Sequence, residues 1–121
     1  MALLFHITTR AEWNAALAAG SYRPASLDRE GFIHASTAAQ VVATANARFA
    51  GCDDLVLLCI DEARVRADLR YEHPPARDPR AHEQFPHIYA ALQPEAVVDV
   101  VAFPCDPVHG FRLSDRGLTD G

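Results

Sequence analysis

The chain has 121 residues, half of them apolar, a length and composition typical of one compact domain. Its net charge is −5 and all 11 cationic side chains are arginines scattered along the sequence, so we expect no duplex DNA partner. Single arginines can still bind a small anionic ligand such as a phosphate. The three cysteines include no C-x-x-C pair, and no apolar run approaches the ~20 residues of a membrane helix. We therefore expect a cytoplasmic protein without a membrane segment.

Hydrophobic periodicity and turn residues predict that strands and helices alternate in the first half of the chain. Thr9 and Glu12 have the spacing of a capping box that opens a helix, and Gly20 is suited to ending it. The expected elements are a strand over 3–8, a helix from Thr9 to about Gly20, a polar connector over 21–30, a strand over 31–35 and a helix from Ser36 or Thr37 to Gly51.

The second half of the chain is predicted to be mostly β. Residues 55–60 are apolar throughout, as in a strand buried on both faces. The other expected elements are one helical turn within 61–68, a strand over 69–72, a long loop over 73–86, a short strand over 87–92, a strand over 96–103, a last strand over 110–113 and a frayed tail from about 114. This order predicts a single α+β domain over residues 1–121.

Three histidines, His6, His34 and His87, lie in short apolar, strand-like segments. A buried imidazole must find a hydrogen-bond partner or line a pocket, because burying an unpaired polar group costs a few kcal/mol. Each histidine alone could be a packed residue bonded to a backbone carbonyl, whereas the set of three predicts a shared site. If the strands that carry His6 and His34 are paired, both imidazoles open onto one face.

Hydroxyl side chains accompany two of these histidines. Ser36 and Thr37 follow His34, and Thr8 lies beside His6. The simple interpretation of Ser36 and Thr37 is helix capping, and a helix N-terminus next to His34 is also able to receive a phosphate. Thr8 allows a similar pair of interpretations.

The segment 83–89 is the most unusual in the sequence. His87 and Tyr89 are two residues apart and would face the same side of an extended chain. Tyr89 is expected either to stack on a flat ligand ring or to be a half-buried core tyrosine. Glu83 and Glu72 are candidate general bases or stabilisers of an oxocarbenium ion, unless they are solvated loop charges.

Inorganic groups could also complete a site of this composition. Three histidines and a water molecule form a catalytic zinc site in some enzymes, although no two of His6, His34 and His87 have the short spacing of a zinc-binding helix. Arg77 and Arg80, in the expected loop, are candidates for holding a phosphate.

The ordered segments of the chain resemble a bacterial family known as domain of unknown function 952. The segments that carry the resemblance are Phe5-His6-Ile7-Thr8 followed by Trp13, then Ser26-Leu27, then Gly31-Phe32-Ile33-His34-Ala35-Ser36-Thr37, and finally Phe85-Pro86-His87-Ile88-Tyr89. The resemblance extends from Leu4 to about Leu113. It implies an ADP-ribosyltransferase-like fold, in which two N-terminal helices accompany split, curved β-sheets around a cleft for a nicotinamide dinucleotide.

The resemblance also implies roles for the histidine segments. In such enzymes a first-strand histidine touches the ribose next to nicotinamide, and His6 matches that position. The second strand would contribute His34, Ser36 and Thr37 to the cleft, and the third segment would place His87 and Tyr89 across it. These transferases carry a late-strand glutamate that steadies the ribosyl cation. Here the strand expected over 96–103 offers only Asp99, Glu83 lies in a loop, and neither residue matches that glutamate.

The function expected from this comparison is binding of NAD or a related ribonucleotide, with transfer or cleavage of ADP-ribose. His6 would hold the ribose hydroxyls, Tyr89 would stack on a base, and Ser36 would bind phosphate. His87 or Glu83 would stabilise the ribosyl charge or act as general base. The alternatives are a non-catalytic nucleotide-binding module and a metal-dependent hydrolase built on the three histidines. The sequence indicates no oligomeric state.

Overall fold

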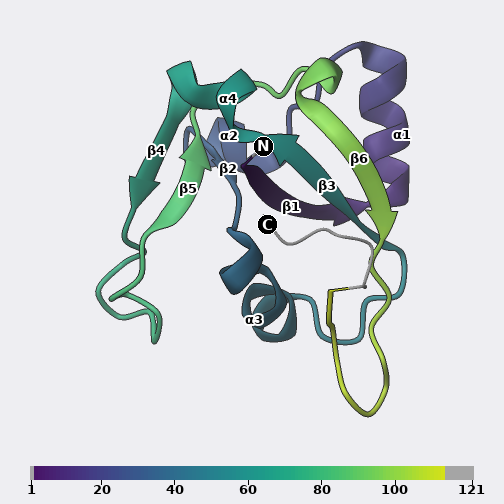
Figure 1. Cartoon of the computed structure of the whole chain (residues 1–121), viewed down its shortest axis with the longest axis vertical. Helices are drawn as coiled ribbons and strands as arrows, with labels where there is room; N and C mark the ends of the chain where they lie inside the picture. The colour runs from purple at the N-terminus through teal and green to yellow at the C-terminus, as the bar shows by residue number, and fades with distance from the viewer. Residues whose placement is uncertain (1, 114–121) are drawn as a thin grey trace.

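The structure, a computed structural model, describes residues 2–113 and contains two three-stranded antiparallel sheets with short helices around them (Figure 1). The elements in chain order are β1 (Leu3–Thr9), α1 (Arg10–Ala19), α2 (Ala25–Arg29), β2 (Ile33–His34), α3 (Ala38–Arg48), β3 (Leu55–Asp61), α4 (Glu62–Val65), β4 (Leu69–Glu72), β5 (Phe85–Ile88) and β6 (Val97–Ala102), with 3-10 turns at Arg66–Asp68 and Pro94–Ala96. The described part of the chain is therefore mixed α+β, as its element order predicts.

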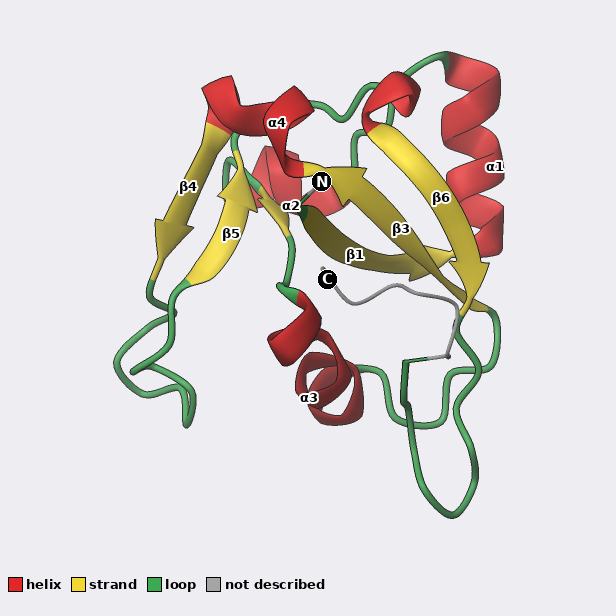
Figure 2. Cartoon of the chain, in the orientation of Figure 1, coloured by secondary structure: helices red, strands yellow, loops and turns green. Residues whose placement is uncertain are grey.

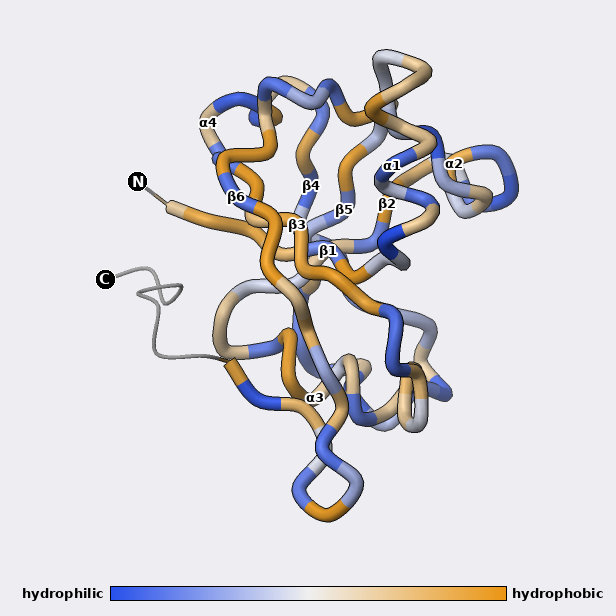
Figure 3. Tube along the Cα trace, turned by 90° about the vertical axis from the view of Figure 1, so that its right-hand side faces the viewer, coloured by the Kyte–Doolittle hydropathy of each residue, from blue (hydrophilic) through white to orange (hydrophobic). Residues whose placement is uncertain are grey.

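The first sheet has β3 at its centre, between β1 and β6. The register pairs Phe5 of β1 with Cys59 of β3, and Leu57 of β3 with Val101 of β6. Residues 55–60 are all buried, and Figure 3 shows the apolar stretch that runs along β3. The prediction of a strand covered on both faces is confirmed.

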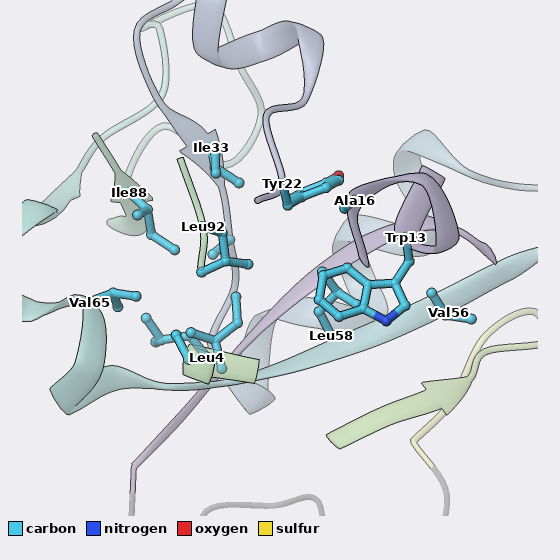
Figure 4. Close-up of a cluster of buried hydrophobic side chains, with 13 residues drawn as sticks. Leu4, Trp13, Ala16, Tyr22, Ile33, Val56, Leu58, Val65, Ile88 and Leu92 are labelled. Carbon is cyan, nitrogen blue, oxygen red and sulfur yellow. The ribbon is translucent and has the colours of Figure 1, made fainter. Parts of the chain in front are cut away.

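Successive residues of β3 point to two different hydrophobic clusters, because side chains alternate along a strand. Trp13 and Ala16 of α1 pack with the first cluster, which Figure 4 draws, and Val41 and Ala45 of α3 pack with the second. From β3 the first cluster takes Val56, Leu58 and Ile60, and the second takes Leu55, Leu57 and Cys59. The two helices thus cover opposite faces of the first sheet.

The same alternation in β1 decides where its histidine lies. Leu4 belongs to the first cluster, whereas Phe5 and Ile7 belong to the second. His6 and Thr8 are in step with Leu4, so they lie on the α1 side of the strand. Phe5 and Ile7, which flank His6, lie on the other side, against α3.

The second sheet has β5 at its centre, between β2 and β4. His34 of β2 lies opposite His87 of β5. The next position along, Ala35, donates its N–H to the carbonyl of Pro86 at 3.0 Å, but Pro86 has no N–H to return. The proline therefore ends the ladder, which explains why β2 has only two residues.

Among the described residues, one backbone bridge joins the segments of the two sheets. Phe5 and Ser36 exchange two hydrogen bonds, each 2.8 Å long. The strands that carry His6 and His34 thus lie in different sheets, so the condition under which both imidazoles would open onto one face is met only at this bridge. His6 reaches the backbone of His34 through its side chain instead.

The helix boundaries follow the capping residues. Thr9 accepts a hydrogen bond from the N–H of Glu12 at 3.1 Å, and Gly20 ends α1 with a left-handed φ of 85°. Thr37 and Gln40 form a complete capping box at the start of α3. Both helix starts are confirmed.

Several other elements differ from the prediction. The connector over 21–30 contains α2, a five-residue helix with no buried residue, so it has no apolar periodicity to detect. The strand expected over 87–92 begins earlier, at Phe85. Residues 110–113 form no strand, because the Phe111 N–H donates to Asn46 Oδ1 at 3.0 Å rather than to a neighbouring strand.

The tail expected from about residue 114 lies outside the described residues. Within residues 2–113, no helix is long and apolar enough to cross a bilayer.

Candidate functional site

A large open cleft, with a volume of about 1170 Å³, has walls from β1, residues 22–36, α3 and the loop after β4. Figure 2 shows this loop extending beyond the end of the second sheet. Of the residues that the sequence suggests for a site, eight line the cleft: His6, Thr8, His34, Ser36, Glu72, Arg77, Arg80 and His87. Three do not: Thr37, Glu83 and Tyr89.

The second sheet turns one face to the core and the other to the cleft. Ile33 and Ile88 are essentially unexposed and belong to the first hydrophobic cluster. Because side chains alternate along a strand, His34 and His87 point to the opposite face, where they lie side by side across the ladder. Glu72 of β4 shares this face, two residues beyond the position that pairs with His87.

Glu72 is the centre of a hydrogen-bond network on the cleft face. His87 Nδ1 donates to Glu72 Oε1 at 2.8 Å, and the Tyr89 hydroxyl donates to the same oxygen at 2.5 Å. The hydrogen bonds from Tyr89 and His87 lower the pKa of Glu72, so its carboxylate is ionised at neutral pH. The bond to Glu72 raises the pKa of Tyr89, which keeps its proton on the hydroxyl.

His87 is buried, and an aromatic ring stacks on it. The Phe32 ring stacks on the His87 ring with centroids 3.9 Å apart and planes inclined by 17°. Burial lowers the pKa of His87, and the hydrogen bond to Glu72 opposes this effect. The neutral imidazole is therefore favoured, with its Nδ1 proton directed to the carboxylate.

His34 forms a second histidine–carboxylate pair next to the first. Its Nε2 lies 3.1 Å from Glu30 Oε1, and 54% of its side chain is exposed. The rings of His34 and His87 meet edge to face, with centroids 5.7 Å apart. The Phe32 ring also contacts the His34 ring at a tilted angle, with centroids 4.8 Å apart. The two imidazoles and one phenyl ring thus form a compact group on the cleft wall.

His6 lines the cleft, but both of its ring nitrogens are occupied. Nδ1 donates to the carbonyl oxygen of His34 at 2.5 Å, which leaves Nε2 to accept from the Tyr22 hydroxyl at 2.7 Å. Burial lowers the pKa of His6 to about 4 and raises the pKa of Tyr22 to about 12, the latter opposed by a hydrogen bond with Thr8. His6 is therefore a neutral link between β1, Tyr22 and the backbone of β2.

The hydroxyl groups near α3 are also engaged. Thr37 caps the helix, and its N–H donates to Gln40 Oε1 at 3.1 Å. Ser36 Oγ, which reaches the cleft, donates to Thr44 Oγ1 at 3.4 Å. The first turn of α3 thus has its own capping partners, and of the two hydroxyls only that of Ser36 lines the cleft.

Glu83 lies away from the histidines, in an anchor that ties the loop after β4 to α3. Arg80 Nε donates to Glu83 Oε2 at 3.1 Å, and its Nη1 donates to Thr44 Oγ1 at 2.7 Å. Its Nη2 donates to the Gln40 carbonyl at 3.2 Å. The hydrogen bond from Arg80 lowers the pKa of Glu83. Arg80 therefore holds the loop in place.

The structure adds residues that the sequence did not single out for the site: Arg29, Glu30, Phe32 and Tyr22. Phe32 precedes His34 by two residues, so strand alternation alone could have placed it near the imidazoles. Glu30 had no such signal, because it lies in a turn after a helix that the sequence did not predict. The contact of Tyr22 with His6 arises from tertiary packing and leaves no local pattern.

The described residues do not form a metal centre. Within residues 2–113, no three His, Cys, Asp or Glu side chains are placed to hold a metal ion. In addition, the two hydrogen bonds of His6 leave it no nitrogen for a ligand bond. His6, His34 and His87 therefore do not make the zinc site that the sequence left open.

Comparison with known proteins assigns this two-sheet α+β chain, with its histidine-lined cleft, to a family. The sequence profile described as "Protein of unknown function (DUF952)" matches residues 7–100. The chain belongs to the DUF952 family. A search of curated proteins found no match.

Solved structures of one bacterial protein, CC0527 of Caulobacter crescentus, are similar to this chain. Its crystal structure has a TM-score of 0.80 and 32% identity, with 92% of this chain and 94% of that chain covered. Its solution NMR structure has a TM-score of 0.76 and 34% identity, with 92% and 91% covered. The crystal structure of a double mutant of CC0527 is as similar to this chain as that of the unmutated protein.

Proposed function

We propose that the cleft binds NAD or a related ribonucleotide and that Glu72 stabilises positive charge on the ribose as its glycosidic bond breaks. The observation that carries this proposal is the Glu72 carboxylate on the cleft wall, fixed by His87 and Tyr89 through one oxygen. A carboxylate held beside the anomeric carbon is the general means by which glycosyl-transferring enzymes stabilise an oxocarbenium ion.

The electrostatics of Glu72 suit this role. The hydrogen bonds from Tyr89 and His87 lower its pKa and keep it anionic. They also fix its position before substrate arrives, so no reorganisation is needed when charge develops in the transition state. Glu72 takes the role for which Glu83 was also a candidate, since Glu83 is engaged by Arg80. Tyr89 then acts through Glu72 rather than by stacking on a base.

The rest of the cleft suits a dinucleotide. Its volume of about 1170 Å³ slightly exceeds the range of about 300–1,000 Å³ that is usual for ligand pockets, which leaves room for two nucleotides. Phe32 and Phe85 supply aromatic surface for a base. Arg29 and Arg77 line it without an ion-pair partner among the described residues, so they are free to contact phosphates.

We further propose that the two sheets are the core of an ADP-ribosyltransferase-like fold. Two three-stranded antiparallel sheets joined by the Phe5–Ser36 bridge, with the cleft beside that junction, support this assignment. In this arrangement His6 fixes the positions of Tyr22 and the His34 backbone in the cleft wall through its two hydrogen bonds.

The test combines binding and turnover. We expect calorimetry to show saturable binding of NAD and ADP-ribose, and chromatography to show slow release of nicotinamide from NAD. Glu72→Gln should retain binding within about threefold and lose release by roughly 100-fold, because it removes charge needed mainly in the transition state. The matched control is Glu95→Gln, a carboxylate outside the cleft.

Three outcomes are distinct. Binding without nicotinamide release in the wild-type protein would identify a non-catalytic nucleotide-binding module. Equal release by the wild type and Glu72→Gln would remove Glu72 from the reaction. If the protein binds neither NAD nor ADP-ribose, the proposal as a whole is overturned.

A further inference from the structure

We propose that His34 and His87 form a paired acid–base centre that hydrolyses 2′,3′-cyclic ribonucleotides in the same cleft. This inference rests on the proposed function only in placing a ribonucleotide there. Its geometric basis is two histidine–carboxylate pairs, Glu30–His34 and Glu72–His87, whose imidazoles lie opposite each other with centroids 5.7 Å apart.

Each carboxylate engages one ring nitrogen and leaves the other available. His87 uses Nδ1 for Glu72, so Nε2 is the remaining nitrogen. No buried side-chain nitrogen or oxygen among the described residues lacks a partner, so the unbonded Nε2 of this buried residue must reach solvent. His87 lines the cleft, so that nitrogen can meet a ligand. His34 uses Nε2 for Glu30 and keeps Nδ1.

The two imidazoles are in different environments, which suits opposite roles. Burial lowers the pKa of His87 and favours the neutral form that accepts a proton. His34 has 54% of its side chain exposed, and its Nε2 lies 3.1 Å from Glu30 Oε1, so in this proposal it takes the role of the proton donor. A base and an acid are thus held on neighbouring strands.

Cleavage of the glycosidic bond of NAD does not require a general acid such as His34. Nicotinamide departs as a neutral base from a cationic glycoside, so its leaving nitrogen needs no proton. A ribose oxygen that leaves phosphorus must be protonated, because an alkoxide is a poor leaving group. The Glu30–His34 pair therefore points to a phosphate ester of ribose rather than to a glycosidic bond.

The cationic groups of the cleft fit a phosphate. Four arginines line it, of which Arg48 pairs with Asp78 and Arg80 with Glu83. Arg29 and Arg77 have no carboxylate partner within residues 2–113. Arg29 immediately precedes Glu30, the residue that orients His34. A guanidinium is thus available to bind the non-bridging oxygens.

The step balances with water as the co-reactant. Neutral His87 Nε2 takes a proton from water as the water oxygen bonds to phosphorus. The bond from phosphorus to the ribose 2′-oxygen breaks, and that oxygen receives the proton of His34 Nδ1. The product is a ribonucleoside 3′-monophosphate, and solvent returns both imidazoles to their starting forms.

The test is hydrolysis of 2′,3′-cyclic AMP by the purified full chain, followed by phosphorus NMR. We expect conversion to adenosine monophosphate, lowered by roughly 100-fold or more in both His34→Ala and His87→Ala, because each removes a general acid or base. His34→Ala should fold, since its side chain is more than half exposed. His109→Ala is the matched control, because 70% of the His109 side chain is exposed and His109 does not line the cleft.

The outcomes separate this inference from the proposed function. ADP-ribose binding without hydrolysis of the cyclic phosphate would overturn the acid–base pair and leave the nucleotide cleft standing. Hydrolysis that depends on His34 in a protein that binds neither NAD nor ADP-ribose would support the pair and overturn the NAD proposal. Hydrolysis unchanged in a folded His34→Ala variant would also overturn the pair.

Discussion

His34 and His87 lie directly opposite each other in the β2–β5 ladder, and their imidazoles meet edge to face on the wall of the cleft. The two residues are far apart in the sequence, and the short strand β2, which ends opposite Pro86 of β5, brings them together. The pair is shielded by Phe32 and fixed by Glu30 and Glu72. We therefore expect the protonation and reactivity of these histidines to depend on their contacts with Phe32, Glu30 and Glu72, each of which can be removed by a single substitution.

The first prediction concerns the shielding of His87. Phe32→Ala removes the ring stacked on His87, so the burial that lowers the pKa of His87 is relieved and this pKa should rise toward 6.5. An NMR titration of the histidine ring protons measures the change. Phe32→Leu should keep more of the cover and shift the pKa less. An unchanged pKa in Phe32→Ala would mean that other groups bury His87.

The second prediction concerns stability and pH. The pKa of His6 is about 4 in the folded protein and 6.5 in the unfolded chain, so the unfolded state takes up its proton first as pH falls. The stabilisation from neutral His6 is complete above pH 6.5 and is lost as the pH falls toward 4, by roughly 3 kcal/mol. Urea denaturation at several pH values measures it.

The matched variant for this prediction is His6→Gln. It should flatten the rise of stability with pH between 4 and 6.5, with a residual slope from His87, whose pKa is also lowered. His109→Gln, in an exposed loop, should keep the wild-type slope. A slope that is the same in His6→Gln and wild type would show that His6 is not buried as a neutral group.

The third prediction concerns the partner of His6. Tyr22→Phe leaves His6 Nε2 without its donor, and the buried acceptor should cost about 1–3 kcal/mol of unfolding free energy. Tyr71→Phe is the control, because Tyr71 is 41% exposed and its hydroxyl bonds to Glu62 at the surface. We expect less than about 0.5 kcal/mol for that change. Equal effects would contradict the buried bond.

The fourth prediction concerns the loop after β4. Arg80→Ala removes the hydrogen bonds to Thr44, Gln40 and Glu83 that tie the loop to α3. Hydrogen exchange at the amides of residues 78 and 80–83 should accelerate by roughly tenfold or more, because the loop then opens more easily. Arg77→Ala, which removes no such bond, should leave exchange unchanged. Unchanged exchange in Arg80→Ala would show that the Arg80 side chain does not hold the loop on α3.

Much of the fold was predictable, because its strongest patterns are local. The apolar run of β3 and the capping residues Thr9 and Thr37 identify their elements without tertiary information. The two-residue length of β2 was not predictable, since it depends on Pro86 lying opposite the strand end. The short α2 buries nothing and so has no apolar pattern.

The candidate site was predictable in part. Strand alternation placed His87 and Tyr89 on one side, and both do reach Glu72. The sequence could not choose between Glu72 and Glu83, because only the β4–β5 register brings Glu72 to the imidazole. Nor could it show that both nitrogens of His6 are occupied, since one partner is a backbone carbonyl in another sheet.

The most direct measurement is an NMR titration of the histidine imidazoles with ADP-ribose. We predict saturable shifts of the His34 and His87 ring resonances at a common dissociation constant, with His109 unaffected because it lies outside the cleft. Shifts at His109 alone, or no saturable shift at His34 and His87, would contradict a ribonucleotide site on this face of the second sheet.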